Sequence, residues 1–243
     1  MYSPIDNDVF QGTIPEEVGL LTSLENLVIK NSMGLIGSIP SSLGILSDLR
    51  QLALFNNNLQ GKVPTELFSL EKLSYLNLAK NNLSGRISLK FGDLMEKLVF
   101  DNNNFTGRLV LRDLRNTKIS LLSLSFNRIS MELDKDVGLL RGLKYLYLDA
   151  NEITGKIPTT IGLLTKLQTL SLGDNKFNGT LPYELGALTA LEHLAVPKND
   201  LTGKLPGSIG NCTELKRIHL DGNSFKGTIP LSFYTLDKLG KDM

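Results

Sequence analysis

The sequence predicts an α/β solenoid, a coil of stacked strand-and-turn units in which each strand lies beside its counterpart in the next unit. Three observations predict it: a repeat about every 24 residues, an alternating leucine pattern within each repeat, and an asparagine and a glycine at fixed places after that pattern. A repeat this short cannot bury its own apolar face. Neighbouring copies must therefore stack to form one continuous core.

Each repeat follows the pattern L-x-x-L-x-L-x-x-N-x-L-x-G-x-I-P-x-x-L-G-x-L, which is clearest from Leu143 to Leu164. The first residue of the L-x-L pair marks nine repeats, at Leu27, Leu52, Leu76, Leu98, Leu122, Leu146, Leu170, Leu194 and Ile218. A truncated repeat that includes Asp8 precedes them. We therefore expect one array over residues 1–243, with a partial repeat at 1–23, nine repeats over about 24–243 and no complete caps.

The L-x-L segment alternates between inward and outward side chains, as a strand with one buried face must. Stacked copies then pair into one parallel sheet. The asparagine that follows fits a buried ladder, because its amide can satisfy backbone groups of its own and the neighbouring turn. It recurs at Asn57, Asn81, Asn103, Asn127, Asn151, Asn175, Asn199 and Asn223.

The glycine suits a bend or a left-handed backbone. The proline after it ends a short second strand and begins a turn, because proline cannot extend strand pairing. The L-G-x-L tail then predicts a short helical turn on the outer side. The proline recurs at Pro15, Pro40, Pro64, Pro158, Pro182, Pro206 and Pro230.

The L-x-G-x-I-P segment resembles the plant-type class of leucine-rich repeat proteins. This class includes ectodomains of receptor-like kinases, receptor-like proteins and polygalacturonase inhibitors. The resemblance covers essentially the whole chain. It implies a right-handed solenoid with a concave parallel sheet, short second strands and 3-10 or helical turns outside. It also implies that the concave sheet recognises proteins, peptides or small hormones.

Composition limits the partners and the compartment. The net charge of +1 argues against nucleic acid or an anionic membrane as the main partner. The sequence contains no run of 18 apolar residues, so it predicts no membrane span. The N-terminus is polar and acidic, unlike a signal peptide. Cys212 is the single cysteine and is expected to be a small buried residue, so the paired cysteines of the family's caps are missing. We therefore expect a fragment of a longer protein.

Four N-x-S/T sequons are predicted glycosylation sites, although about three would arise by chance at this composition. They lie at Asn82, Asn104, Asn178 and Asn211. The resemblance implies an extracellular or cell-surface location, a glycoprotein, and a membrane-associated parent protein in signalling. An intracellular location is the alternative.

Side chains that flank the inward leucines form an outward grid, and we expect ligands to bind there. One candidate cluster is Tyr145, Tyr147 and Asp149, which lie along one strand. A second, apolar cluster centres on Phe55 and Tyr75 with Val99 nearby. The grid also contains Asp101 and the pair His193 and His219, which lie on adjacent strands, offset by two positions. We interpret this pair as ordinary surface histidines, because no third ligand for a metal ion is placed. A metal-binding or pH-sensing role is the alternative.

The middle of the array is irregular. Three successive repeats lose the proline and have Ser88, Val110 and Asp134 in its place, and one loses its glycine to Met131. The step from Leu76 to Leu98 is also two residues short. We therefore predict that the second short strand is weak or absent from about residue 88 to 135.

Catalytic motifs are missing. Residues 222–228 lack the lysine that a nucleotide-binding loop requires, and residues 101–104 lack the spacing and distal glutamate of a calcium loop. The sequence therefore predicts no enzyme, no catalytic residue, no cofactor and no metal site. The leading interpretation is a recognition module that binds a protein or peptide on the concave face. The alternatives are an intracellular scaffold or assembly subunit that uses lateral faces and uncapped ends, and an enzyme inhibitor.

Overall fold

The computed structural model describes residues 10–240 and divides into two compact units, residues 1–118 and 119–243. Asp8 of the truncated repeat and the last three residues, 241–243, lie outside the described residues. Each unit consists of stacked repeats, and each is described by itself. The single array over 1–243 stays a prediction.

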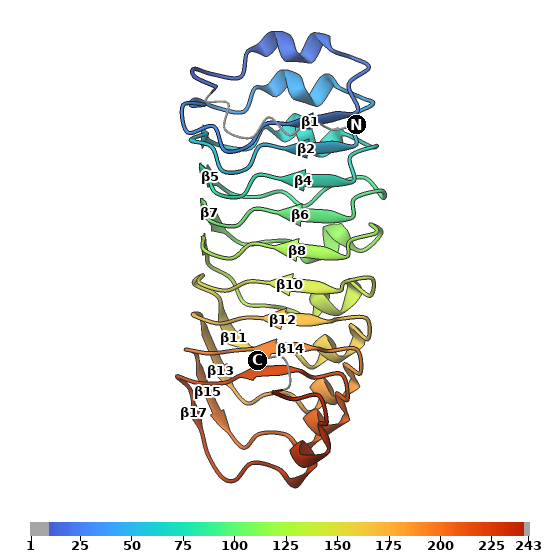
Figure 1. The fold of residues 1–243 in the computed structure, drawn as a ribbon, viewed down its shortest axis with the longest axis vertical. Coiled ribbons are helices and arrows are strands. Elements are labelled where there is room, and N and C mark those ends of the chain that lie inside the picture. Colours follow the sequence, from blue (N-terminus) through green and yellow to red (C-terminus); the bar gives the residue numbers. More distant parts are fainter. Residues whose placement is uncertain (1–9, 241–243) are drawn as a thin grey trace. The chain divides into compact units, whose positions relative to one another are not determined.

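In each unit the L-x-L segments form three-residue strands that pair in parallel, and we call this the main sheet (Figure 1). In the first unit the strands are β1 (Asn26–Val28), β2 (Gln51–Ala53), β4 (Tyr75–Asn77) and β6 (Lys97–Val99). In the second unit they are β8 (Leu121–Ser123), β10 (Tyr145–Tyr147), β12 (Thr169–Ser171), β14 (His193–Ala195) and β16 (Arg217–His219).

The register of the main sheet is the one that the repeat predicts. Leu52 pairs with Leu76 in the first unit, and Leu146 pairs with Leu170 in the second. Nearly all of these central leucines have no more than 1% of their surface exposed. Because each such side chain contributes about 1.5–3 kcal/mol by leaving water, the row of leucines is the main source of stability.

The second strands of the repeats form a flank sheet in each unit. In the first unit they are β3 (Gln60–Gly61), β5 (Asn82–Gly85) and β7 (Asn104–Gly107). In the second unit the flank sheet consists of β11 (Thr154–Lys156), β13 (Lys176–Gly179), β15 (Asp200–Gly203) and β17 (Ser224–Phe225). Strand β9 (Arg128–Ile129) lies outside this four-stranded sheet, and its repeat is joined to β11 by a single bridge from Glu132 to Thr154. The repeat glycine lies in or close to the last part of these strands and has a positive φ, +88° at Gly85 and +79° at Gly155, as its sequence position predicts.

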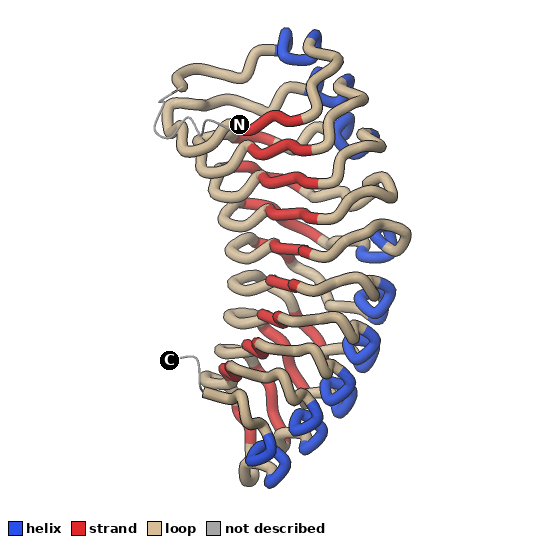
Figure 2. The backbone as a smooth tube through the Cα atoms, turned by 45° about the vertical axis from the view of Figure 1, so that its right-hand side comes forward, coloured by secondary structure: helices blue, strands red, loops and turns tan. Residues whose placement is uncertain are grey.

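Short 3-10 helices follow the prolines, on the side of the coil opposite the main-sheet strands in each unit (Figure 2). All seven repeat prolines are the residue that precedes the first helical residue, where the missing N–H costs nothing. The described helices are η1 (Glu16–Leu20), η2 (Ser41–Ile45), η3 (Thr65–Ser69), η4 (Leu111–Leu114), η5 (Lys135–Leu139), η6 (Thr159–Leu163), η7 (Tyr183–Ala187), η8 (Gly207–Asn211) and η9 (Leu231–Thr235).

The asparagine ladder is confirmed. The side chain of Asn175 accepts a hydrogen bond from the N–H of Ile153 at 3.0 Å and donates to the carbonyl oxygens of Leu148, Leu172 and Gly173 at 2.9–3.2 Å. Asn151 makes the same set of bonds one repeat earlier. Each amide thus joins the turn of its own repeat to the preceding repeat.

The prediction of a weak or absent second strand at about 88–135 is wrong for β7, whereas β9 is short, with two residues. Strand β7 has four residues, as many as β13 and β15, and β9 is as long as β17. The reason is that the lost proline lies after the strand, whereas Asn103 and Gly107, which set its two ends, are kept. A bridge from Glu132 to Thr154 continues the pairing past Met131.

The loss of the proline and the shortened repeat change the outer helices instead of the strands. No helix forms among the described residues between β5 and β6, where the repeat is two residues short, and η4 has only four residues. Asp134 replaces the proline at η5 and caps it, because its carboxylate accepts from the N–H of Asp136 at 3.0 Å. Phe68 occupies the place of the usual helical glycine and packs edge-on against Phe91, with ring centroids 5.1 Å apart. It fits because the next helix is missing.

Candidate functional site

The open face of the main sheet in the second unit carries the first predicted cluster. Tyr145 and Tyr147 lie at the two ends of β10 with their side chains on the solvent face, and both are half-buried. Neither hydroxyl has a hydrogen-bond partner within the part of the chain that the structure describes. The sheet therefore presents two phenol groups that can donate to a ligand.

The carboxylate of Asp149 accepts hydrogen bonds from groups within the protein. One carboxylate oxygen accepts from the hydroxyl of Ser171 at 2.7 Å and from the N–H of Gly173 at 2.8 Å. The other oxygen accepts from the hydroxyl of Ser125 at 3.2 Å, and that hydroxyl in turn accepts from the N–H of Asp149. Asp149 thus ties three neighbouring repeats together beside β10. It positions the surface on which the tyrosines lie.

Phe126 lies in a turn next to the Asp149 repeat, at a position that the leucine-flanking grid omits. It follows Ser125 in the turn after β8 and is 58% exposed. Its φ of +57° is left-handed, a conformation that a bulky side chain adopts only at a cost. Its N–H donates to the carbonyl oxygen of Asp149 at 2.9 Å, which fixes the turn beside the β10 repeat. The signal in the sequence is that Phe126 is the one aromatic residue in the column directly before the ladder asparagine.

The predicted cluster in the first unit is less accessible. Phe55, Tyr75 and Val99 are each half-buried, and the Tyr75 hydroxyl accepts a hydrogen bond from the side-chain amide of Asn77 at 2.9 Å. Asp101 is also half-buried, in the turn that follows β6. The surface of this unit therefore has fewer groups available to a ligand than the β10 surface has.

The histidines lie as the repeat predicts. His193 pairs in register with Arg217, and Ala195 with His219, so the two histidines are offset by two positions. The Nδ1 atom of His193 lies 3.5 Å from the hydroxyl of Thr169. Within residues 10–240, no three histidine, cysteine or acidic side chains gather closely enough to hold a metal ion.

The sequons differ in accessibility. Asn82, Asn178 and Asn211 are exposed, whereas Asn104 is half-buried and donates from its amide to the Asn82 side chain at 2.6 Å. Cys212, which follows Asn211, is fully buried, and its thiol lies 3.3 Å from the carbonyl oxygen of Leu185. Burial raises the pKa of the Cys212 thiol from 9.0 to about 11. The prediction of a small buried residue is thereby confirmed.

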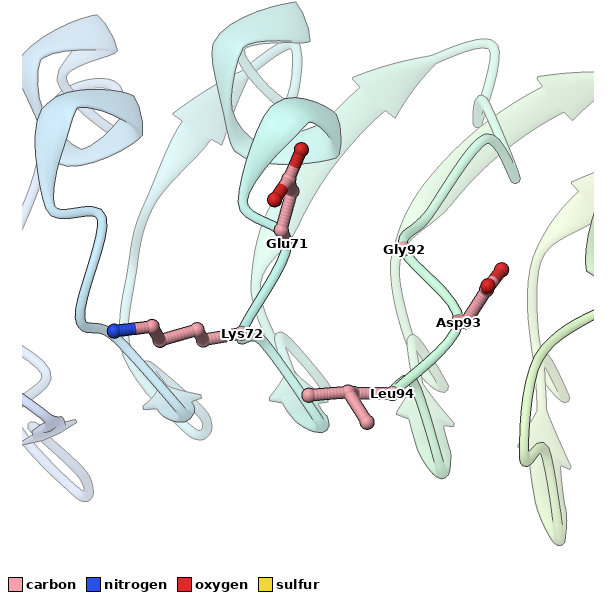
Figure 3. A pocket seen from close by; sticks show the side chains of 5 residues that line it. All are labelled: Glu71, Lys72, Gly92, Asp93 and Leu94. Atoms are coloured by element: carbon pink, nitrogen blue, oxygen red, sulfur yellow. The ribbon is translucent and has the colours of Figure 1, made fainter.

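A pocket of about 510 Å³ lies in the first unit where the helix is missing. It is lined by Glu71, Lys72, Gly92, Asp93 and Leu94 (Figure 3). Lys72 extends away from Asp93 toward the preceding repeat and bonds the carboxylate of Asp48 at 2.6 Å. That hydrogen bond lowers the pKa of Asp48. The pocket is open and lined by exposed charged side chains together with Leu94, and it contains none of the predicted site residues.

Comparisons with known proteins agree with this geometry. The family model described as Leucine Rich Repeat matches residues 72–94, 142–164, 166–188 and 214–236. The chain is 34% identical to the plant peptide hormone receptor RGFR1, solved in complex with RGF2, with a TM-score of 0.91 over 94% of this chain and 37% of that one. No curated protein sequence matches.

Two other solved structures are similar. A TDR receptor is 33% identical, with a TM-score of 0.89 over 95% of this chain and 40% of that one. The PEPR1–AtPEP1 complex is 29% identical, with a TM-score of 0.81 over 95% and 36%. The chain spans less than half the length of each of these three proteins.

The chain is a plant-type leucine-rich repeat protein, as its L-x-G-x-I-P segments predict. Its fold is typical of binding modules that have no catalytic activity. No helix among the described residues is both long enough and apolar enough to cross a lipid bilayer.

Proposed function

We propose that the chain recognises a peptide segment on the open face of the main sheet in the second unit, in an extracellular setting. The observation that carries this proposal is the aromatic surface made by Tyr145, Tyr147 and Phe126. Two phenol hydroxyls without partners and a 58% exposed phenylalanine lie on a backbone that the asparagine ladder and Asp149 hold in place. A surface fixed in this way loses little conformational entropy on binding.

The chemistry of the three side chains suits a peptide. The tyrosine hydroxyls can donate to backbone carbonyl oxygens of an extended chain, and the rings cover its apolar side chains. Phe126 supplies apolar area at the edge. Rigid aromatic side chains of this kind commonly contribute 2 kcal/mol or more each at protein interfaces. The mixed polar and aromatic character favours a peptide over a purely hydrophobic or strongly charged ligand.

The solved relatives support this choice of ligand. RGFR1 is a plant peptide hormone receptor that was solved in complex with RGF2. The Arabidopsis receptor kinase HAESA, which is 26% identical to this chain with a TM-score of 0.63, was solved in complex with the peptide hormone IDA and the co-receptor SERK1. A further relative, 33% identical with a TM-score of 0.77, is the ectodomain of the plant membrane receptor kinase GASSHO1/SCHENGEN3 from Arabidopsis thaliana. These relatives support the proposal that this chain lies outside the cell, as part of a receptor-like or secreted protein. A glycan on exposed Asn178 or Asn211 of native protein would support this location and argue against an intracellular scaffold.

Selection from a random peptide library tests the proposal. The full chain is immobilised, and the affinity of a selected peptide is compared for the wild type and the Tyr145→Ala/Tyr147→Ala variant. We expect the double variant to bind about 100-fold more weakly, the equivalent of about 2.7 kcal/mol. Tyr183→Ala is the matched control, because Tyr183 is 71% exposed on η7, on the outer side. Equal affinity of wild type and double variant, or a loss in the Tyr183 variant alone, would place the site elsewhere.

A further inference from the structure

Both histidines of the chain lie on the same open face of the second unit as Tyr145 and Tyr147. His193 is two strands from Tyr145 in the same outward row, and His219 is three strands from Tyr147 in the next row. At about 4.8 Å per strand, the histidines lie about 10 Å and about 14 Å from those tyrosines. The two kinds of side chain are therefore within reach of one ligand.

The side chains between the tyrosines and the histidines are small. They are Thr169 and Ser171 on β12 and Ala195 on β14, and these strands follow β10 directly in the sheet (Figure 1). No bulky side chain separates the two groups along these rows. An extended peptide advances about 3.3 Å per residue, so about three to four residues lead from the tyrosines to the imidazoles.

His193 is surrounded by positive charge and has no carboxylate within 4 Å in the described part of the chain. Thr169 lies on one side, with its hydroxyl 3.5 Å from Nδ1, and Arg217 lies opposite on β16. Glu192 precedes His193, and its carboxylate lies 3.0 Å from the ammonium of Lys216. A protonated His193 therefore finds no acidic partner in the protein itself.

His219 is exposed and lies opposite Ala195. Arg217 lies on the same strand and face, two residues earlier. Asp221 follows two residues later in an exposed turn, and its carboxylate is more than 4 Å from the imidazole. His219 therefore also has no ion pair among residues 10–240.

Other carboxylates of this face are already engaged. Asp149 accepts from the Ser171 hydroxyl and the Gly173 N–H, and Asp174 lies 3.2 Å from the ammonium of Lys198. The groups that remain for a ligand are two phenol hydroxyls and two imidazoles, which all can donate hydrogen bonds. A surface of donors matches a ligand that supplies an acceptor, and a carboxylate is the strongest acceptor that a peptide offers.

We infer that the peptide recognised on this face carries an acidic side chain, which pairs with the protonated imidazoles of His193 and His219. The inference rests on the proposed function and names the chemistry of its ligand. Histidine changes its charge between about pH 5 and 8. Because a carboxylate favours the protonated imidazole, binding takes up protons, and affinity rises as the pH falls through this range. Below about pH 4 the ligand carboxylate is protonated and the attraction is lost.

Selection of a random peptide library on the immobilised full chain, in parallel at about pH 5.5 and about pH 8, tests the inference. Peptides selected at the lower pH should contain Asp or Glu about three to four positions from the residue that covers the tyrosines. They should bind wild type about fivefold more tightly at the lower pH, the most that an exposed ion pair contributes. Replacing that acid by its amide in the peptide should remove the difference.

The His193→Gln/His219→Gln variant should bind such a peptide equally at both pH values, with the affinity that wild type has at the higher pH. Lys198→Gln is the matched control. It removes a cation from the turn after β14 whose charge does not change in this range, so the fivefold ratio should persist. Urea unfolding of both variants at the higher pH checks that they fold like wild type.

Three results would overturn the inference: equal affinity of wild type at both pH values, a pH dependence that persists in the histidine double variant, or one that disappears only when the carboxyl end of the peptide is amidated. Each can occur while the Tyr145→Ala/Tyr147→Ala variant still loses binding, so each leaves the proposed function standing. A selected peptide that binds without the two tyrosines would instead remove the proposed function.

Discussion

The asparagine ladder allows a quantitative test of the repeat architecture, and Asn175 is the best position for it. Its side chain is about nine-tenths buried and makes four hydrogen bonds. In Asn175→Ala the buried N–H of Ile153 loses its partner, whereas the carbonyl oxygens keep others. Leu148, for example, still accepts from Asn151. The variant therefore orphans one buried donor and loses three further bonds.

The expected cost follows from those bonds. An orphaned buried donor costs about 1–3 kcal/mol, and we expect about 3 kcal/mol in total once the weaker losses are added. For a chain of this size that corresponds to a fall in the melting temperature of about 6–12 °C. Asn175→Asp should destabilise at least as much, because a carboxylate cannot donate to the three carbonyl oxygens that surround the amide nitrogen.

Urea unfolding followed by circular dichroism measures the effect. Asn178→Ala is the matched control, since Asn178 lies on the same strand, β13, and is exposed. We expect it to stay within about 0.5 kcal/mol of wild type. Equal stability of the Asn175 and Asn178 variants would refute the role of the ladder. So would an Asn175→Asp variant that is as stable as wild type at neutral pH.

Three further predictions concern other parts of the second unit. Gly186→Ala should cost about 2–3 kcal/mol in urea unfolding, because the new Cβ atom collides with the backbone oxygen of Ser208. At Gly207 the atom nearest to a new Cβ is the Ser232 hydroxyl oxygen at 3.6 Å, so Gly207→Ala should stay within about 1 kcal/mol of wild type. A larger loss at Gly207 than at Gly186 would contradict the packing. The Cys212 thiol should resist a disulfide reagent in native protein at pH 8. Because its folded pKa is raised to about 11, stability should fall as the pH rises from 9.0 to about 11, and a rise would contradict its burial. Asp149→Ala should cost about 1–3 kcal/mol in urea unfolding even without a ligand, and an unchanged midpoint would show that its hydrogen bonds contribute nothing.

The repeat pattern predicts most of the fold. The leucine register, the left-handed glycines, the helix-starting prolines and the asparagine ladder all follow from the spacing, because each position has one physical role in every repeat. The pattern fails between 88 and 135 because it does not say which element absorbs an irregularity. There the loss of proline changes the outer helices, whereas Asn103 and Gly107 preserve strand β7.

The candidate site is only partly predictable. The outward direction of Tyr145 and Tyr147 follows from the strand period. The hydrogen bonds that the Asp149 carboxylate accepts from the Ser171 hydroxyl and the Gly173 N–H do not follow from the spacing alone. Phe126 lies in a turn, outside the strand alternation, so its exposure depends on the left-handed backbone that the structure reveals.

Hydroxyl-radical footprinting with a library-selected peptide is the most direct test of ligand recognition on the second unit. The peptide should protect Tyr145, Tyr147 and Phe126 from oxidation while the exposed Tyr183 stays reactive. Protection confined to Tyr183, or no protection at the three aromatic residues while the peptide is bound, would contradict the account.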